Sequence, residues 1–216
     1  HRQSSAASDV YKRQLTILLF SIVLFLSIYS VWRISQPRIL SVEEMKVNGF
    51  FKYGNYEALR NFDLIDHNGN SFTNESFKEK DLNFIYFGYS SCPTECPVMM
   101  SVMRQLYEKI ETDNIAYYLI SFDPEIDTLT RLKSYVTAFN KDFMGISGDI
   151  SEVVKLGYQL GIEKLAPMEN HMNQRVISHT NHLVVVNSKG EVIGIFKAPF
   201  ESSAMSLVTK SLLATQ

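Results

Sequence analysis

An uncharged and strongly apolar stretch near the start of the chain constrains what its first residues can form. Leu15 to Trp32 reads LTILLFSIVLFLSIYSVW. As an α-helix rising about 1.5 Å per residue it would be roughly 27 Å long, close to the hydrocarbon thickness of a bilayer. Lys12 and Arg13 precede it, and Tyr29 and Trp32 lie near its far end, where aromatic side chains favour the membrane interface. The sequence therefore predicts one transmembrane anchor over residues 15–32.

A cleaved signal peptide is the alternative interpretation of this stretch. The apolar part of a signal peptide usually has about 7–15 residues and ends in a small-x-small site. No Ala-x-Ala-like sequence follows here. We therefore favour a retained anchor, with the N-terminus inside and the rest of the chain exported.

The remaining residues divide by composition. Residues 1–14 lack an initiator Met and any periodicity, so we expect an unstructured or foreign leader. Residues 33–59 are polar with scattered apolar positions and predict a tether, which leaves 60–216 as the folded body. Residues 1–38 hold five basic and one acidic side chain, and the rest hold 16 basic and 22 acidic. An acidic body offers no electrostatic footprint for phosphate backbones, so we do not expect a nucleic-acid partner.

The hydrophobic pattern of the body alternates between two periods. Short apolar runs bounded by polar residues predict buried strands, and apolar residues at helical spacing predict helices. The predicted elements, in chain order, are a hairpin at 62–73, a strand at 82–87, a helix at 98–110, a strand at 115–122, a helix at 129–139, a helix from the capping box Asp149-x-x-Glu152 to a stop at Gly161, a hairpin at 182–196 and a helix at 202–214. This order predicts an α/β fold with a mixed sheet, the thioredoxin arrangement.

Cys92 and Cys96 are the only cysteines, and they lie between a predicted buried strand and a predicted helix. A helix N-terminus stabilises thiolates, which makes them nucleophiles or metal ligands. Three interpretations stay open: a structural disulfide or inert thiols, a redox pair, and a metal site. Three residues separate the cysteines where redox pairs usually have two. Two soft thiolates favour Cu(I) but need a further ligand.

His179 is the candidate for that further ligand. It lies in VISHTNHLVVVN, just before the predicted hairpin. In a thioredoxin-like topology this connection lies beside the cysteine-bearing loop, although a lone histidine is more often a surface or capping residue. For His182 we expect the opposite sheet face, and for His67 a solvated turn.

With these residues in place, the sequence resembles the Sco/SenC family from about Phe62 to the C-terminus. The resemblance is carried by FDLIDHNGNSFT, FGYSSCPTECP, ISFDPEIDT, FMGISGDISEVVKLGYQLGI and the histidine motif SHT-x-x-x-x-VV-x-x-x-G. It implies that Cys92, Cys96 and His179 are metal ligands. Ser178 departs from the pattern, because the family commonly has Asp before the histidine.

The resemblance implies a membrane-anchored copper metallochaperone that carries Cu(I), with Cu(II) also open, to the Cu-A centre in subunit II of cytochrome c oxidase. It further implies a copper donor or thiol reductant as partner. The chain would sit in the inner membrane with its body in the periplasm, or in the equivalent mitochondrial intermembrane space. The alternative is an enzyme or sensor: a thiol-disulfide oxidoreductase or redox sensor acting on oxidase cysteines, or a thiol peroxidase. The spacing of the cysteines and the lack of a third one predict weak catalysis.

A second group of metal-binding side chains precedes His179. Met168, His171 and Met172 have i, i+3, i+4 spacing, so one helical turn would place them on a shared face. Thioethers and imidazole are acceptable Cu(I) ligands. We therefore predict a weak accessory copper site there, with a polar surface loop as the alternative.

Overall fold

The computed structural model describes residues 2–55, 58–110, 112–163, 168–169 and 175–215. The chain forms two compact units, His1–Arg38 and Ile39–Gln216. We call the second unit the body.

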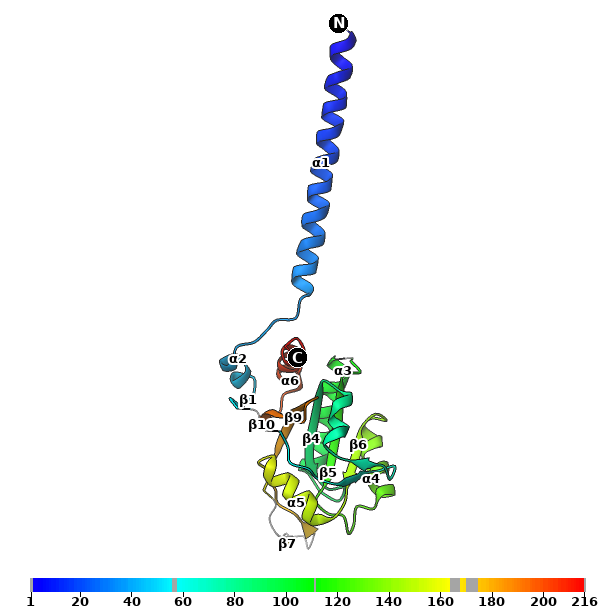
Figure 1. Cartoon of the computed structure of the whole chain (residues 1–216), viewed down its shortest axis with the longest axis vertical. Coiled ribbons are helices and arrows are strands. Elements are labelled where there is room, and N and C mark those ends of the chain that lie inside the picture. Colours follow the sequence, from blue (N-terminus) through cyan, green and yellow to red (C-terminus); the bar gives the residue numbers. More distant parts are fainter. Residues whose placement is uncertain (1, 56–57, 111, 164–167, 170–174, 216) are drawn as a thin grey trace. The chain divides into compact units, whose positions relative to one another are not determined.

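The first unit is a single long helix, α1 (Arg2–Ser35) (Figure 1). Within it, Val10–Ser35 has a mean hydropathy of 2.3 and is the one helix among the described residues that is long and apolar enough to cross a membrane. The helix is longer than the predicted anchor. It includes residues 2–14, for which the sequence predicts an unstructured or foreign leader.

The body is built on one eight-stranded mixed sheet, as predicted from the sequence. Its strands, in sheet order, are β1 (Phe50–Lys52), β10 (Val192–Lys197), β9 (His182–Asn187), β4 (Leu82–Gly88), β5 (Ile115–Ser121), β6 (Met144–Ser147), β2 (Leu64–Asp66) and β3 (Ser71–Phe72). The central strands β4, β5 and β6 are parallel, and the flanking strands β9 and β2 run antiparallel to them. The short strands β7 (Met168–Glu169) and β8 (Arg175–Val176) form a separate pair.

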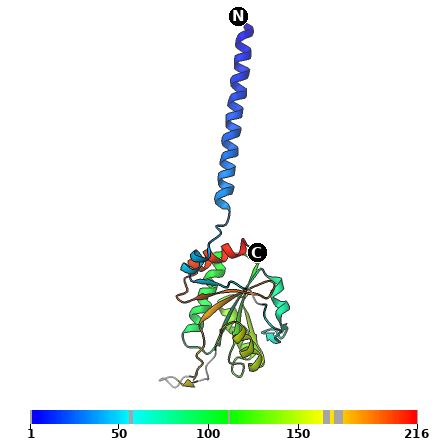
Figure 2. The same ribbon diagram turned by 60° about the vertical axis from the view of Figure 1, so that its left-hand side comes forward.

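Helices cover both faces of this sheet. They are α2 (Val42–Val47), the 3-10 helix η1 (Asn74–Glu79), α3 (Glu95–Ile110), α4 (Leu129–Phe139), α5 (Ile150–Gln159) and α6 (Ser202–Leu213). Neighbouring residues of a strand point to opposite faces. Accordingly, Tyr117 of β5 contacts Tyr107 of α3, whereas Tyr118 contacts Phe77 of η1. Figure 2 shows α3 and η1 on opposite sides of the strands.

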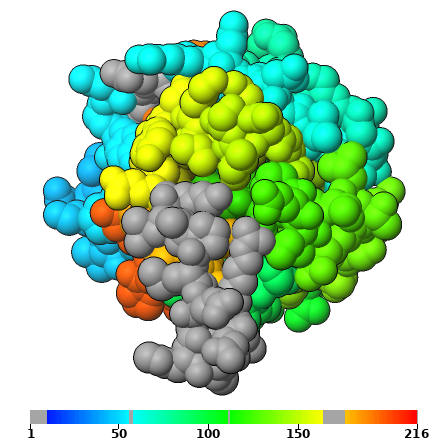
Figure 3. Space-filling view, turned by 90° about the horizontal axis from the view of Figure 1, so that it is seen from below, coloured from blue at the N-terminus to red at the C-terminus, as the bar shows by residue number. Residues whose placement is uncertain are grey.

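This two-sided cover explains the continuous apolar run at 82–87. All seven residues of β4 are buried, so no position of this strand needs a polar side chain. Helix α5 lies at the surface of the body, where it is seen in yellow in Figure 3, and its Tyr158 is exposed.

The predicted tether differs from the structure in its second half. Residues from Leu40 onward belong to the body: Leu40, Met45 and Phe50 are buried, and β1 pairs with β10. Ser41 caps α2 through a capping box with Glu44. These elements are short, and their burial depends on distant strands, so local periodicity does not reveal them.

The expectation of a solvated His67 was wrong. The residue is 8% exposed, and its ring Nδ1 accepts the backbone N–H of Gly145 at 3.0 Å. The predicted turn between β2 and β3 is present, but it packs against the start of β6 through this hydrogen bond.

Candidate functional site

The cysteine-bearing loop starts where β4 ends, at Gly88. A Cβ atom at this position would lie 2.9 Å from the sulfur of Cys96, closer than atoms of this kind approach each other. Glycine therefore allows α3 to place Cys96 directly against the end of the strand. Since α3 begins at Glu95, Cys92 lies in the loop before the helix rather than within it.

The two thiols have different environments. Cys96 is fully buried, whereas Cys92 is partly exposed. The backbone N–H of Cys96 donates to the sulfur of Cys92 at 3.4 Å. A hydrogen bond from the Cys96 side chain, aided by the backbone N–H groups of Cys96 and Thr94, lowers the pKa of Cys92 to about 5. The same thiol pair, together with burial, raises the pKa of Cys96. Only Cys92 is therefore prepared to be a thiolate at neutral pH.

Only one of the two ring nitrogens of His179 forms a hydrogen bond with the backbone. Its Nδ1 lies 3.1 Å from the carbonyl oxygen of Thr180, which can only accept, so Nδ1 carries the proton. In the neutral ring Nε2 then keeps its lone pair, which is the form of histidine that binds metals.

Two aromatic rings hold His179 beside the cysteine loop. The imidazole lies 6.0 Å from the ring of Tyr86 and 5.6 Å from the ring of Phe122, measured between centroids. The Tyr86 hydroxyl is buried without a nitrogen or oxygen partner among the described residues, and it faces the sulfur of Cys96. Tyr86 therefore contacts both predicted parts of the site.

The structure brings the predicted residues together only in part. The two sulfurs are adjacent, and the imidazole of His179 contacts the ring of Tyr86, whose hydroxyl faces Cys96. No group of three His, Cys, Asp or Glu side chains with the spacing of a metal site occurs within the described part of the chain. The assignment of Cys92, Cys96 and His179 as one ligand set stays a prediction.

Sequence reasoning missed two residues that hold the loop. The Tyr89 hydroxyl accepts the backbone N–H of Ile177 at 3.0 Å. The buried carboxylate of Asp127 accepts the backbone N–H of Ser90 at 2.9 Å. Asp127 belongs to the ISFDPEIDT segment and directly precedes Thr128, the N-cap of α4.

The predicted accessory copper site is largely outside the described residues. His171 and Met172 lie outside them. Met168 lies in β7, paired with Val176, and not in a helical turn. The proposed shared helical face therefore does not apply at Met168, and the accessory site stays a prediction.

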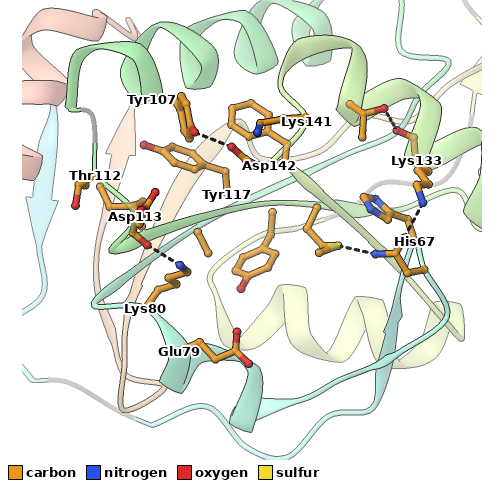
Figure 4. A pocket seen from close by; sticks show the side chains of 17 residues that line it. His67, Glu79, Lys80, Tyr107, Thr112, Asp113, Tyr117, Lys133, Lys141 and Asp142 are labelled. Atoms are coloured by element: carbon orange, nitrogen blue, oxygen red, sulfur yellow. Dashed lines mark hydrogen bonds between the residues drawn. The ribbon is translucent and has the colours of Figure 1, made fainter.

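A pocket of about 710 Å³ in the described body lies away from the cysteine loop (Figure 4). It opens near the start of β5, at the end of the sheet opposite the cysteine loop. The seven residues of β4 separate these ends by about 20 Å. Its charged side chains include Glu79, Lys80, Asp113, Lys133, Lys141 and Asp142. Three of its polar side chains are engaged locally: Lys80 with the Asp113 carbonyl, Lys133 with Asn68 and Tyr107 with Asp142. No cysteine is among the described residues that line this pocket, whereas the cysteine loop carries both thiols. The cysteine loop is therefore the better candidate for the functional site.

Comparison with known proteins agrees with the sequence motifs around this loop. The family model for SCO1/SenC matches residues 52–214, most of the body. The chain belongs to the SCO1/SenC family. This confirms the resemblance seen in the sequence.

Two relatives illustrate the similarity within the family. A protein of Stutzerimonas stutzeri named for copper binding is 28% identical over 159 residues, which cover 72% of this chain and 77% of that protein. An SCO2-like protein of Rickettsia conorii is 35% identical over 94 residues, which cover 43% of this chain and 45% of that protein. The chain thus spans less than half of this second relative.

Solved SCO1/SenC structures share the fold. Arabidopsis thaliana ScoI with copper bound aligns with a TM-score of 0.68 and 18% identity, over 74% of this chain and 100% of that one. BsSco, described as having a disulfide switch and as a member of the Sco family of cytochrome c oxidase assembly proteins, aligns with a TM-score of 0.55 and 20% identity, over 76% and 98% of the two chains. The predicted thioredoxin-like fold is confirmed.

Proposed function

We propose that the body binds one Cu(I) ion through the sulfurs of Cys92 and Cys96 and the Nε2 atom of His179. The pair of adjacent sulfurs at the start of α3 is the observation that carries this proposal. Soft thiolates suit Cu(I), and one imidazole completes a three-coordinate site without a buried carboxylate. Such binding requires the Nε2 atom of His179 to come within bonding distance of the two sulfurs.

The copper is cargo, to be delivered to the Cu-A centre in subunit II of cytochrome c oxidase. Membership of the SCO1/SenC family supports this, as does the description of BsSco as belonging to a family of oxidase assembly proteins. A partly exposed Cys92 above a buried Cys96 suits transfer, since an incoming ligand can replace the outer sulfur first. A copper donor or a thiol reductant would load the site or keep it reduced.

The body would act at a membrane surface, on the exported side. The apolar helix within α1 supports a single-pass anchor over residues 15–32. The compartment would be the periplasm, or the equivalent mitochondrial intermembrane space.

Copper titration of the reduced full chain in detergent tests the proposal. We expect one Cu(I) per chain, loss of tight binding in Cys92→Ala and Cys96→Ala, and weaker binding in His179→Ala. His182→Ala is the matched control, because this histidine lies at the start of β9 and should leave the affinity unchanged. Equal affinity in the parent and the three site variants would refute the copper site.

A thiol-disulfide oxidoreductase, or a redox sensor of the same chemistry, is the second candidate function. The unequal thiols favour it: Cys92 has a lowered pKa and is accessible, and Cys96 is buried behind it. The Cys92 thiolate would attack an oxidase disulfide, and Cys96 would displace the client from the mixed disulfide. The client gains two thiols, and the body is oxidised to a Cys92–Cys96 disulfide. Efficient disulfide reduction by the His179→Ala protein would favour this enzyme over the metallochaperone.

A further inference from the structure

Tyr89 is a buried residue that contacts the cysteine loop through its backbone. It is 1% exposed, and its carbonyl oxygen accepts the backbone N–H of Cys92 at 3.3 Å. Its hydroxyl also lies close to the Cys92 sulfur. Tyr89 is therefore part of the local structure that sets the position of Cys92.

The same hydroxyl reaches the segment that carries the histidine. The backbone N–H of Ile177 donates to the Tyr89 Oη atom at 3.0 Å, and both residues are buried. Two residues later lies His179. Thr180, next to it, is fixed by two hydrogen bonds with Glu163, at 3.0 and 3.1 Å. His179 is thus held between two anchored residues, one of which depends on the Tyr89 hydroxyl.

We propose that Tyr89 is a positioning residue for the copper site, because its hydroxyl joins the Cys92 loop to the His179 segment. The inference rests on the proposed function. The two segments are 87 positions apart in the chain, counted from Cys92 to His179, and the Ile177 hydrogen bond connects them directly. A buried backbone N–H needs a partner, so this hydrogen bond restricts the approach of the histidine to the sulfurs.

Tyr89→Phe removes only the oxygen atom and leaves the buried ring in place. We expect the reduced full chain in detergent to bind Cu(I) about 10–100-fold more weakly in this variant, the usual effect of losing an outer contact of a metal site. Tyr117→Phe is the matched control. It also removes a hydroxyl from a buried tyrosine on the sheet, but far from the cysteine loop, and should leave the affinity unchanged.

A double-mutant cycle separates positioning of His179 from any other role. If Tyr89 acts through His179, Tyr89→Phe should change the affinity by no more than about twofold in the His179→Ala background. The same large loss in both backgrounds, or an unchanged affinity in the single variant, would overturn the inference while leaving the copper site in place. Failure of the parent chain to bind Cu(I) would overturn the proposed function and the inference with it.

Discussion

The carboxylate of Asp127 accepts the backbone N–H of Ser90, 37 positions earlier in the chain, with 2.9 Å between the nitrogen and Oδ2. The same carboxylate accepts the Ser121 hydroxyl at 2.6 Å and a short hydrogen bond from the Ser90 hydroxyl. Arg131 donates to the Ser90 hydroxyl at 2.7 Å. Because Ser90 is two residues before Cys92, this network fixes the base of the cysteine loop.

Asp127→Asn should therefore destabilise the body. The NH₂ group of the new amide would face the groups of Ser90 and Ser121 that now donate to the carboxylate. Losing these hydrogen bonds to a buried charged group should lower the free energy of unfolding by about 2–3 kcal/mol. Urea denaturation of residues 39–216, followed by circular dichroism, measures this change. Glu75→Gln is the control: this side chain is 74% exposed and pairs with Lys78 at the surface, so its loss should cost less than about 1 kcal/mol. Equal effects of the two substitutions would show that the Asp127 network does not stabilise the loop.

The two cysteines should react with iodoacetamide at very different rates. The pKa of Cys92 is lowered to about 5, so its alkylation rate should be nearly constant at neutral pH and fall only in acid. Cys96 should stay unmodified in the folded protein, because it is fully buried and its pKa is raised. Cys96→Ala should move the rate profile of Cys92 to higher pH, since the hydrogen bond from the Cys96 side chain is the largest cause of the lowered pKa. Mass spectrometry of the labelled peptides distinguishes the two sites, and similar labelling of both would contradict this assignment.

The stability of the body should fall in mild acid because of His67. Burial is the main cause that lowers the pKa of His67 below the ordinary 6.5. The negative charge of Asp66 raises this pKa in part, and the positive charge of Lys133 lowers it further. The unfolded chain then binds more protons than the folded one, so stability is lost as the pH falls through 6.5 towards the lower pKa of the folded state. His182, whose pKa is also lowered by burial, adds to the same trend.

Urea denaturation between about pH 5 and pH 7 tests this prediction. His67→Asn is the informative variant, because its side-chain oxygen can accept the Gly145 N–H where Nδ1 does but does not titrate. It should show a smaller loss of stability in acid than the parent. An identical pH dependence in both would mean that His67 does not contribute.

Sequence patterns by themselves determined the elements whose periodicity is local. The apolar run at 82–87 became the buried strand β4, and the hairpin at 182–196 became β9 and β10. The position of Cys92 between a strand and a helix also followed, because the order of elements along the chain places the loop there, whereas Cys96 lies in the first turn of α3. The family resemblance predicts that His179 belongs to the same site.

Only the tertiary structure decided which contacts hold that site. Asp127 looks like a helix-capping residue in the sequence, and Tyr89 looks like any aromatic beside a strand. Their partners, Ser90 and Ile177, are 37 and 88 positions away. His67 and the strand β1 were likewise misjudged, since both are buried by residues distant in the chain. Periodicity reports which side of an element is apolar, but a hydrogen bond between distant segments exists only after the sheet has brought them together.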